Sequence, residues 1–534
     1  MSQKVSYEVL HNPFIYIHSQ PIPFRNCFSP TSFSIKQTHH KQTSMATMSP
    51  MWFILLEITC FFVAHAYVEN MSLRTLSGVS HEEAILGLKA FKASITRRDS
   101  ITSTPPPSYS PSPTPSPLPP QDLKKPHVYP VTSYGADPTG NSDSTEALLA
   151  AIADAAKGPS EGFLMENIKD LGGAQVHLQG GKYLISKPLE LPQPGIGNFM
   201  IHGGTIRASN NFPPDGYLID LFTTGERNSY NYEYITLKDL LLDSNFRGGG
   251  ISVKNSLRIN IDNCYIAHFT NTGILVQGGH ETLIRNSFLG QHITAGGDKH
   301  ERDFSGTGIS LQGNDNAITD VVIFSAAIGI MVTGQANTIS GVHCYNKASG
   351  FGGTGIYLKL PGLTQTRIVN SYMDYTNIVA EDPVQLHISS SFFLGDANIV
   401  LKSVKGVVNG LNIVDNMFSG LNHGVDVVKL DQSNGPFNQI DQVFVARNVV
   451  KGMNLKATVA KMSVQGNGTS WTADFSKSLL FPNLIKHVVY TLIVNGSTFP
   501  NHALRNVSHN RVVVETDEAV SANVFVAVDQ SIAS

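Results

Sequence analysis

The chain has 534 residues, of which 46 are glycine and only 15% are charged. This composition favours many short strands joined by tight turns and argues against a helical bundle. The 38 basic and 41 acidic residues give a formal charge of −3. A nucleic-acid-binding protein is therefore not expected, because such proteins carry a basic surface that neutralises phosphates.

The N-terminal part has the features of an export signal. Residues 52–63 are mostly apolar, and the Ala-His-Ala triplet at 64–66 has the small-x-small pattern of a cleavage site. The apolar run is too short to span a membrane. Residues 1–44 show no globular pattern. We therefore expect residues 1–66 to be an over-extended N-terminus plus a signal peptide, and the mature protein to be secreted and free of the membrane.

Residues 67–126 are expected to form a helical segment followed by a linker. Residues 80–97 have the pattern of one short amphipathic helix, and residues 104–120 are rich in proline and serine. Repeated prolines remove hydrogen-bond donors and hold the backbone extended and solvated. The second stretch therefore predicts a spacer.

The globular part is expected to begin near residue 127. A strand is predicted over 128–135, and after a turn Asp143 or Ser144 caps a helix. A helix at this place would cover the open end of the first coil of a solenoid, where an unpaired strand edge otherwise invites aggregation. Two strands joined by a short turn follow at 173–178 and 181–185.

One phrase recurs through the middle of the chain: a glycine or asparagine followed by Ile-x-Val, Ile-x-Leu or a close variant. Its copies are 21 to 35 residues apart, which is one turn of a solenoid with occasional loop insertions. Residues 127–451 are therefore predicted to form a parallel β-helix. The copies begin at Gly250, Gly273, Gly308, Gly329, Gly355, Asn377, Asn398 and Gly424.

Alternation within this phrase divides the residues between two faces. The first and third residues after the glycine or asparagine are apolar and are expected to point inward, whereas the second and fourth point outward. The expected inward pairs are Ile274 and Val276, Ile309 and Leu311, Ile330 and Val332, Ile356 and Leu358, and Ile399 and Leu401.

A second recurring position is occupied by asparagine or aspartate. Asparagine side chains that stack from coil to coil can bond one another, so this ladder is expected to be structural and its carboxylates to be poor catalytic candidates. The ladder consists of Asp239, Asn263, Asn286, Asp320, Asn370, Asn416 and Asn448.

The repeat ends near residue 452. Residues 452–534 contain alternating segments at 458–464, 488–494, 511–515 and 523–528, which predict a small antiparallel sheet or sandwich closing the end of the solenoid. Cys264 and Cys344 are expected to be unpaired core residues. Asn-x-Ser/Thr sequons predict N-glycosylation on exposed loops. They begin at Asn70, Asn467, Asn495 and Asn506.

Several segments carry a resemblance to a known family. The stretch 134–147 (YGADPTGNSDSTEA), followed by 176–178 and 181–185, resembles the opening of the pectate-lyase-like right-handed β-helix superfamily. Segments 273–281 and 351–358 are similar to the plant quartet-type polygalacturonases. The resemblance implies an all-β, right-handed parallel β-helix secreted to the cell wall, hydrolysis of homogalacturonan, and a role in separating pollen tetrads. We expect a monomer that acts on pectin and needs neither cofactor nor metal.

Outward residues of the β-helix are candidates for binding uronate groups of the substrate. Lysines and glutamines along one column would hold successive carboxylates, and an outward tyrosine would form a platform for a sugar ring. The alternative is a solvated charge ladder that contributes little. The candidates are Lys254, Gln277, Gln312, Tyr357, Lys359, Glu381 and Lys402. Insertions at 291–303 and 346–353 are expected to wall a groove beside them.

The catalytic candidates lie just before the repeated phrase. A glycosidase needs one carboxylic group to protonate the leaving oxygen and a second to activate water or attack the sugar. The Asn-Thr-Asp, Asp-Asp, Gly-His-Gly and Arg-Ile-Lys motifs of other polygalacturonases are not intact, but three successive coils offer Asp374, Asp396 and His423. We expect Asp374 and Asp396 to be acid and base, with His423 positioning one of them. The alternative for each aspartate is a turn residue that bonds its own backbone.

Two other functions fit the same scaffold. A calcium-dependent pectate lyase would use clustered carboxylates for the metal, and the plausible ligands are Asp298, Asp303, Glu381 and Asp382, whose spacing supports no specific site. A non-catalytic, pectin-binding β-helix would explain the missing motifs.

Overall fold

The computed structural model describes residues 127–221, 230–294, 296–347, 349–359 and 365–531. The expected signal peptide, the N-terminal helix, the Pro/Ser-rich linker and the Asn70 sequon lie outside these residues. Within the described ranges, no helix is long and apolar enough to cross a membrane.

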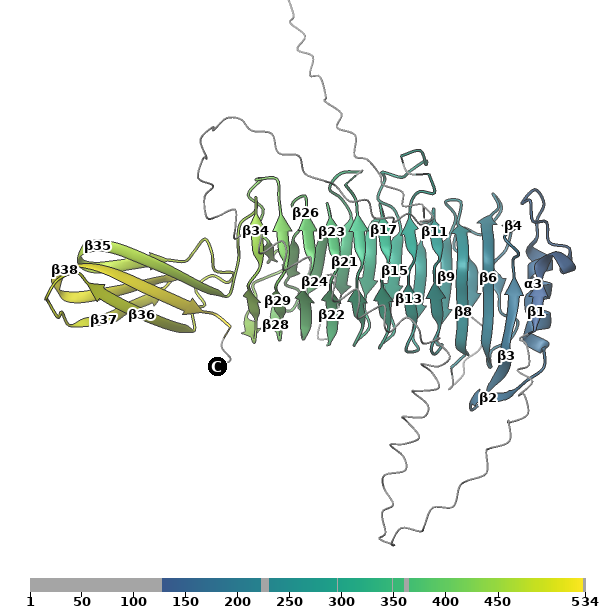
Figure 1. Ribbon diagram of the computed structural model, residues 1–534, viewed down its shortest axis with the longest axis horizontal. Helices are drawn as coiled ribbons and strands as arrows, with labels where there is room; N and C mark the ends of the chain where they lie inside the picture. The colour runs from purple at the N-terminus through teal and green to yellow at the C-terminus, as the bar shows by residue number, and fades with distance from the viewer. Residues whose placement is uncertain (1–126, 222–229, 295, 348, 360–364, 532–534) are drawn as a thin grey trace, which may run out of the picture. The chain divides into compact units, whose positions relative to one another are not determined.

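Most of the described chain is a right-handed parallel β-helix (Figure 1). The repeat predicted the parallel β-helix, and the resemblance implied its hand. One wall is a ten-stranded parallel sheet. It consists of β5 (Leu189–Glu190), β7 (Tyr217–Leu221), β9 (Gly249–Lys254), β12 (Thr272–Gln277), β15 (Thr307–Leu311), β18 (Ile328–Val332), β21 (Thr354–Lys359), β24 (Asn377–Glu381), β27 (Ile399–Lys402) and β31 (Val428–Asp431).

The other walls are two ladders of a 22-stranded sheet, and the long strands β6 and β8 belong to both. The first ladder comprises β3 (Ile168–His177), β6 (Ile196–Ala208), β8 (Tyr232–Asp243), β10 (Asn260–Asp262), β13 (Leu283–Arg285), β16 (Ala317–Thr319), β19 (Thr338–Ser340), β22 (Thr366–Val369), β25 (Leu386–Ser389), β29 (Asn412–Val414) and β33 (Phe444–Ala446). The second adds β4 (Lys182–Ile185), β11 (Tyr265–Ala267), β14 (Phe288–Gly290), β17 (Val322–Phe324), β20 (His343–Tyr345), β23 (Tyr372–Asp374), β26 (Phe392–Leu394), β30 (Met417–Ser419) and β34 (Val449–Lys451). A short parallel pair, β28 (Val407–Asn409) and β32 (Gln439–Asp441), lies outside both ladders.

The inward positions of the repeated phrase are confirmed by the register of the ten-stranded sheet. Their first residues align from strand to strand and are almost fully buried, so they form one continuous row in the core. The row is Ile251, Ile274, Ile309, Ile330, Ile356, Ile378, Ile399 and Val428. The last copy differs from the prediction, because the phrase begins at Gly424 whereas β31 begins at Val428.

Close backbone approach explains the glycines of this phrase. A Cβ atom on Gly273 would lie 2.6 Å from the carbonyl oxygen of Gly308, and one on Gly308 would lie 2.6 Å from that of Gly329. Real Cβ atoms do not approach so closely, so the coils that carry these glycines leave room only for hydrogen at this position. The glycine column is therefore a packing requirement of the stacked coils.

The asparagine and aspartate ladder is partly confirmed. Asn263 donates to Asp239 at 2.7 Å, and Asn416 donates to Asn448 at 3.1 Å, each from one coil to its neighbour. Several ladder residues also have a positive φ, for example 54° at Asp320, a conformation that asparagine and aspartate tolerate better than most residues. These residues therefore shape the turns as well as bonding between coils.

At the N-terminal end, helix α3 (Thr145–Lys157) packs against the first coil and buries its apolar face, as expected for a cap. The strand expected over 128–135 is shorter than predicted. β1 (Val128–Pro130) gives way to a 3₁₀ turn, η1 (Val131–Tyr134), and β2 (Gly162–Met165) forms an antiparallel pair with β3. Proline fixes φ and has no N–H to donate, which favours the end of the strand at residue 130.

The C-terminal part is an antiparallel sheet with its own core, as predicted. It consists of β35 (Val459–Asp474), β36 (His487–Val494), β37 (His502–Ser508) and β38 (Arg511–Asp529). The two halves of the long strands β35 and β38 contribute to one cluster of buried side chains, which gives a sandwich-like unit. β37 was not predicted, because its sequence lacks regular alternation. Cys264 and Cys344 are buried and unpaired, as expected.

Candidate functional site

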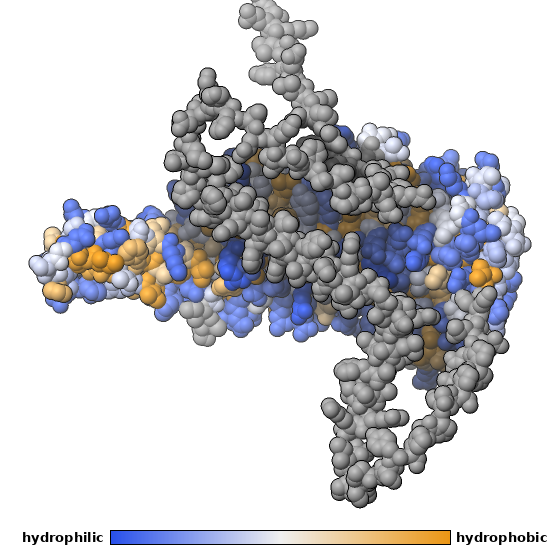
Figure 2. All heavy atoms as spheres, in the orientation of Figure 1, coloured by the Kyte–Doolittle hydropathy of each residue, from blue (hydrophilic) through white to orange (hydrophobic). Residues whose placement is uncertain are grey.

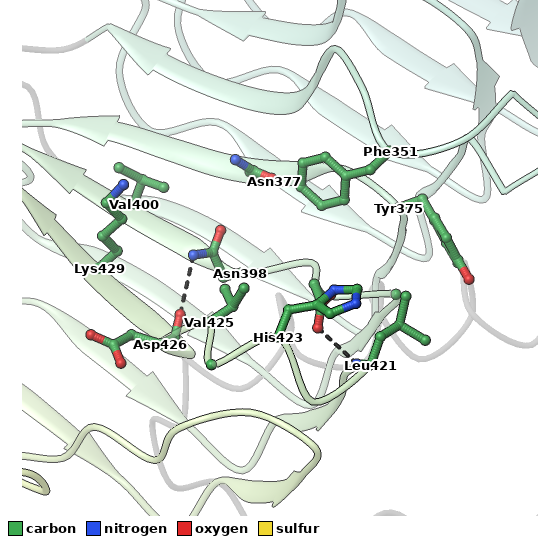
Figure 3. A pocket seen from close by; sticks show the side chains of 13 residues that line it. Phe351, Tyr375, Asn377, Asn398, Val400, Leu421, His423, Val425, Asp426 and Lys429 are labelled. Carbon is green, nitrogen blue, oxygen red and sulfur yellow. Dashed lines mark hydrogen bonds and ion pairs between the residues drawn. The ribbon is translucent and has the colours of Figure 1, made fainter.

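A cleft of about 610 Å³ opens on the outer side of the ten-stranded sheet, where β24, β27 and β31 begin (Figure 3). In Figure 3 the rings of Phe351 and Tyr375 lie toward one end of the cleft, and Asp426 and Lys429 lie toward the other. The cleft is lined by Phe351, Tyr375, Asn377, Gly395, Asp396, Asn398, Val400, Leu421, His423, Gly424, Val425, Asp426 and Lys429.

Two of the three predicted catalytic residues meet in this cleft. His423 Nδ1 lies 2.7 Å from Asp396 Oδ2, and the backbone N–H of Leu421 donates to Asp396 Oδ1 at 2.8 Å. The Asp396 side chain is 10% exposed, whereas the His423 side chain is 66% exposed. The pair thus joins a fixed carboxylate to an imidazole that is open to the cleft.

The local backbone explains how Asp396 is held. Its φ is 64°, in the left-handed region that aspartate tolerates. A Cβ atom on Gly420 would lie 2.5 Å from Asp396 Oδ1, and one on Gly395 would lie 2.2 Å from the ring of Tyr375. These two glycines leave the space that the carboxylate and the aromatic ring occupy.

Asp374 does not share the position expected for it. The register of β23 and β26 pairs Asp374 with Leu394, two residues before Asp396, so the two aspartates are not at equivalent corners of their coils. Asp374 is 2% exposed and does not line the cleft. Burial raises the pKa of its carboxyl, with Lys347 opposing the change, and His343 Nε2 lies 3.9 Å away. The placement disagrees with a role for Asp374 in the cleft.

Asp426 is the second carboxylate of the cleft, and the sequence interpretation missed it. Asn454 donates to Asp426 Oδ1 at 3.0 Å, Lys456 Nζ lies 4.0 Å from Oδ2, and Asn398 donates to the Asp426 carbonyl oxygen at 3.1 Å. The apolar alternation of residues 424–431 could have revealed this position of Asp426. Aligning the strand on Val428 instead of Val425 places Asp426 in the turn that faces the cleft.

A hydrogen-bonded triad lies on the same outer face, beside the cleft. Tyr357 donates to Glu381 Oε1 at 2.5 Å, Lys402 donates to the same oxygen at 2.9 Å, and Lys402 Nζ lies 3.3 Å from the Tyr357 hydroxyl. Val400, which lines the cleft, is two residues before Lys402 on the same face of β27. The prediction from the sequence that Glu381 and Lys402 stack on neighbouring strands is confirmed. It did not include the hydrogen bond from Tyr357 to the Glu381 carboxylate.

Hydrogen bonds within the triad keep the Glu381 carboxylate and the Lys402 ammonium charged. Burial alone would raise the pKa of Glu381, but hydrogen bonds from Tyr357 and Lys402 outweigh burial and lower it. The hydrogen bond to Glu381 raises the pKa of Lys402 to about 12. Burial, followed by the bond to Glu381, raises the pKa of Tyr357. Glu381 is therefore an ionised carboxylate paired with an ammonium, and it is poorly suited to donate a proton.

The remaining substrate-binding candidates lie farther along the same face. Lys254 and Gln277 are register neighbours at the ends of β9 and β12. Gln312 follows β15 and donates to Ser310 Oγ at 3.2 Å. Lys359 is the register neighbour of Glu381 on the side opposite Lys402, so the expected stacking of a carboxylate between two lysines is present in the backbone. None of these four residues lines the cleft.

The two inserted loops differ in their relation to the cleft. The second contributes Phe351, which is 50% exposed. The first is fastened to the coils by His268, whose Nε2 lies 3.1 Å from Asp298 Oδ2. A second histidine–carboxylate pair lies within the loop, with His292 Nδ1 2.8 Å from Glu301 Oε1. This first loop does not line the cleft.

The carboxylates proposed for calcium are engaged separately. Asp382 accepts hydrogen bonds from the backbone N–H groups of four residues in the next turn, residues 404–407. Asp298 bonds His268, Asp303 lies 2.5 Å from His300, and Glu381 bonds Lys402. Among the described residues, no group of three or more histidine, cysteine, aspartate or glutamate side chains is arranged to hold a metal ion.

Several known proteins are similar to this chain in sequence or in structure. The family described as rhamnogalacturonase A/epimerase, pectate lyase-like, matches residues 128–373. Among solved structures, endo-xylogalacturonan hydrolase from Aspergillus tubingensis is 11% identical, with a TM-score of 0.36 over 61% of this chain and 92% of that one. The A-module of mannuronan C-5 epimerase AlgE4 from Azotobacter vinelandii is 14% identical, with a TM-score of 0.39 over 60% and 100%.

Polygalacturonase QRT3 of Arabidopsis thaliana is 62% identical over 456 residues, which cover 85% of this chain and 92% of that protein. With this identity and coverage, the chain belongs to the plant quartet-type polygalacturonase family of glycoside hydrolases.

Proposed function

We propose that this chain hydrolyses α-1,4-galacturonosyl bonds of homogalacturonan in the cleft at Asp396. The observation that carries the proposal is the Asp396–His423 pair, a fixed carboxylate bonded to an imidazole that opens onto the cleft. A second carboxylate, Asp426, lines the same cleft. The cleft therefore contains the two carboxyl groups that a glycosidase requires. The high identity to a relative named polygalacturonase supports the same reaction.

The two carboxyl groups have different roles in the proposed reaction. Asp396 is held by the Leu421 N–H and by His423, and it takes a proton from a water molecule as the water oxygen attacks the anomeric carbon. Asp426 enters the reaction protonated, since Lys456 Nζ lies 4.0 Å from it whereas Lys402 bonds Glu381 at 2.9 Å, and it gives its proton to the glycosidic oxygen as the bond to the leaving sugar breaks. His423 is a positioning residue, because it orients Asp396.

Basic side chains around the cleft fit a polyuronate substrate. Lys429 lines the cleft, and Lys402 lies on the same face of the sheet, two residues beyond Val400, which is the register partner of Lys429. Ammonium groups attract the carboxylates of successive galacturonate units. Phe351, which is exposed, and Tyr375, which is partly buried, add aromatic rings at the other end of the cleft, where sugar rings can pack.

The protein is further proposed to be exported and to act in the cell wall during pollen tetrad separation. The apolar run at 52–63 supports export. The three described sequon asparagines, Asn467, Asn495 and Asn506, are all exposed, which fits N-glycosylation of an exported protein. The likeness to the quartet-type family supports the developmental role.

Incubating the purified protein with polygalacturonate tests the reaction. The proposal predicts new reducing ends without the ultraviolet absorbance of unsaturated products, and no loss of rate with a chelator. Unsaturated products together with sensitivity to the chelator would indicate a calcium-dependent lyase. Binding of polygalacturonate without new reducing ends would indicate a non-catalytic β-helix.

A further inference from the structure

The C-terminal sheet has one face that packs into its core and one that stays open. The even-numbered residues of β36 and of the second half of β38, such as Leu492 and Val524, belong to the core cluster. Because side chains alternate along a strand, the odd-numbered residues of 459–467, 487–495 and 521–529 share the opposite side. We call this side the open face.

The open face carries three exposed apolar side chains among polar ones. Phe525 is 44% exposed and lies between Ser463 of β35 and Thr491 of β36 in the register. Val489 and Ile493 flank this row on β36 and are 56% and 50% exposed. Figure 2 shows apolar side chains gathered among polar ones over the C-terminal strands. Contiguous exposed apolar surface of this kind marks a contact site or a risk of aggregation.

Two sequon asparagines stand at one end of this same face. Asn467 is the register partner of Ser521 on one side. On the other side, the Asn495 N–H donates to the Ser521 carbonyl oxygen at 2.8 Å, and Asn495 Nδ2 lies 3.4 Å from Ser521 Oγ. Both asparagines are exposed, and both have odd numbers, so their side chains project from the open face.

The spacing places the apolar residues within reach of a glycan. Ile493 is two residues from Asn495 along β36, and the row of Thr491 and Phe525 is four residues away. At the rise of a strand these are distances of about 7 and about 14 Å. The first few sugars of an N-linked glycan extend over such a length, and pyranose rings carry an apolar C–H face that packs on aromatic rings.

We propose that N-linked glycans on Asn467 and Asn495 lie over the open face and cover Ile493 and Phe525. The glycans act as a built-in cover that keeps this sheet from associating with other surfaces. The inference rests on the export proposed above, since the modification is made in the secretory pathway. It does not depend on the chemistry of the cleft.

Asn506 provides a matched internal control. It is exposed and begins a sequon, but it lies on β37 and pairs with Val513, in the other half of β38. A glycan at Asn506 is therefore not expected to cover Phe525. Comparing the three asparagines separates an effect of the open face from a general effect of glycosylation on solubility.

The test uses the full chain secreted from a eukaryotic host. Glycopeptide mass spectrometry measures occupancy, and the folded protein is then treated with peptide N-glycosidase, so that glycan loss does not affect folding. Variants Asn467→Gln with Asn495→Gln, and Asn506→Gln alone, are compared by binding of the apolar dye ANS. We expect dye fluorescence to rise at least about twofold on glycan removal and in the double variant, and to stay unchanged in Asn506→Gln.

A further substitution, at Phe525, tests whether the dye binds to the open face. Adding Phe525→Ser to the double variant should cancel most of the gain in fluorescence, because Phe525 points away from the core. Unoccupied Asn467 and Asn495, an unchanged dye signal after glycan removal, or an equal rise in Asn506→Gln would overturn the proposal. Polygalacturonate that binds the open face with the glycans in place would also overturn it. Release of reducing ends, measured on the same samples, should not change, so failure of the proposed reaction and failure of the glycan cover are distinguishable.

Discussion

The proposed chemistry depends on single residues in the turns that precede β24, β27 and β31. Asp396 adopts a left-handed conformation, Gly420 leaves room for its carboxylate, and His423 meets it from the next coil. Each of these features is local, and each is determined by one side chain or by its absence. Substitutions at this scale therefore separate catalytic groups from supporting ones.

Replacing Asp426 by asparagine tests the second carboxylate. The amide keeps the size and the hydrogen bond from Asn454 but cannot supply a proton, so we expect kcat to fall by about 10²–10⁴-fold with little change in KM. The control is Asp415→Asn, because Asp415 also pairs with a basic side chain, Arg447, but lies outside the cleft. Steady-state kinetics on polygalacturonate measure both. Full activity of Asp426→Asn would remove this residue from the mechanism.

Glu381 is expected to make stability depend on pH. Its pKa is lowered in the folded protein, so its contribution is present above the ordinary glutamate value and is lost as the pH falls through the folded value. At about pH 7, Glu381→Gln should lower the free energy of unfolding by about 1–3 kcal/mol, because the hydrogen bonds from Tyr357 and Lys402 lose their charged acceptor.

Denaturant titrations of the wild type and of Glu381→Gln at several pH values measure this difference, which should narrow in acid. Glu515→Gln is the control, because Glu515 forms an exposed pair with Arg505 and should cost less than about 1 kcal/mol. If the difference in unfolding free energy between the wild type and Glu381→Gln grew as the pH fell, Glu381 would not be a stabilising ionised carboxylate.

At the scale of the element, the coils are held in register by close backbone stacking. The glycine column of the ten-stranded sheet lets each coil approach the next, and Asn377 and Asn398 replace glycine in the later coils, where they also line the cleft. In the earlier coils, glycines of this column allow close stacking of the strands. In the later coils, asparagines of the same column contribute polar groups to the cleft. A methyl group in the column should disturb several strands at once.

Gly308→Ala tests the column. The new methyl would lie 2.6 Å from the Gly329 carbonyl oxygen and 3.0 Å from Ile323 Cγ2, so we expect the free energy of unfolding to fall by about 1–3 kcal/mol. Gly297→Ala is the matched control, because its nearest contact would be 3.6 Å. Thermal denaturation followed by circular dichroism compares them. Equal midpoints for the two variants would show that the column tolerates a side chain.

At the scale of the whole molecule, the fold could be predicted because inward apolar alternation is a local property that each coil repeats. The inward residues from Ile274 to Leu401 were predicted in this way. The cleft could be predicted only in part. The turn after Leu394 has one residue more than the turn after Asp374, so Asp396 does not align with Asp374, and apolar alternation along the strands does not record such an insertion.

Asp426 was missed because the turn before β31 is also longer than predicted, so that β31 begins at Val428. The turns of a solenoid carry its functional groups, whereas the strands carry its sequence signal. The sequence therefore predicted that Asp396 and His423 lie together, but it did not predict Asp426 as the second carboxylate of the cleft.

The central claim is that the cleft at Asp396 hydrolyses homogalacturonan, and the activity of Asp396→Asn tests it most directly. The asparagine keeps the shape of the side chain but cannot accept a proton from water. We predict that release of reducing ends from polygalacturonate falls by about 10²–10⁴-fold, while the thermal midpoint and substrate binding stay close to those of the wild type. A folded Asp396→Asn protein that releases reducing ends at the wild-type rate would contradict the account.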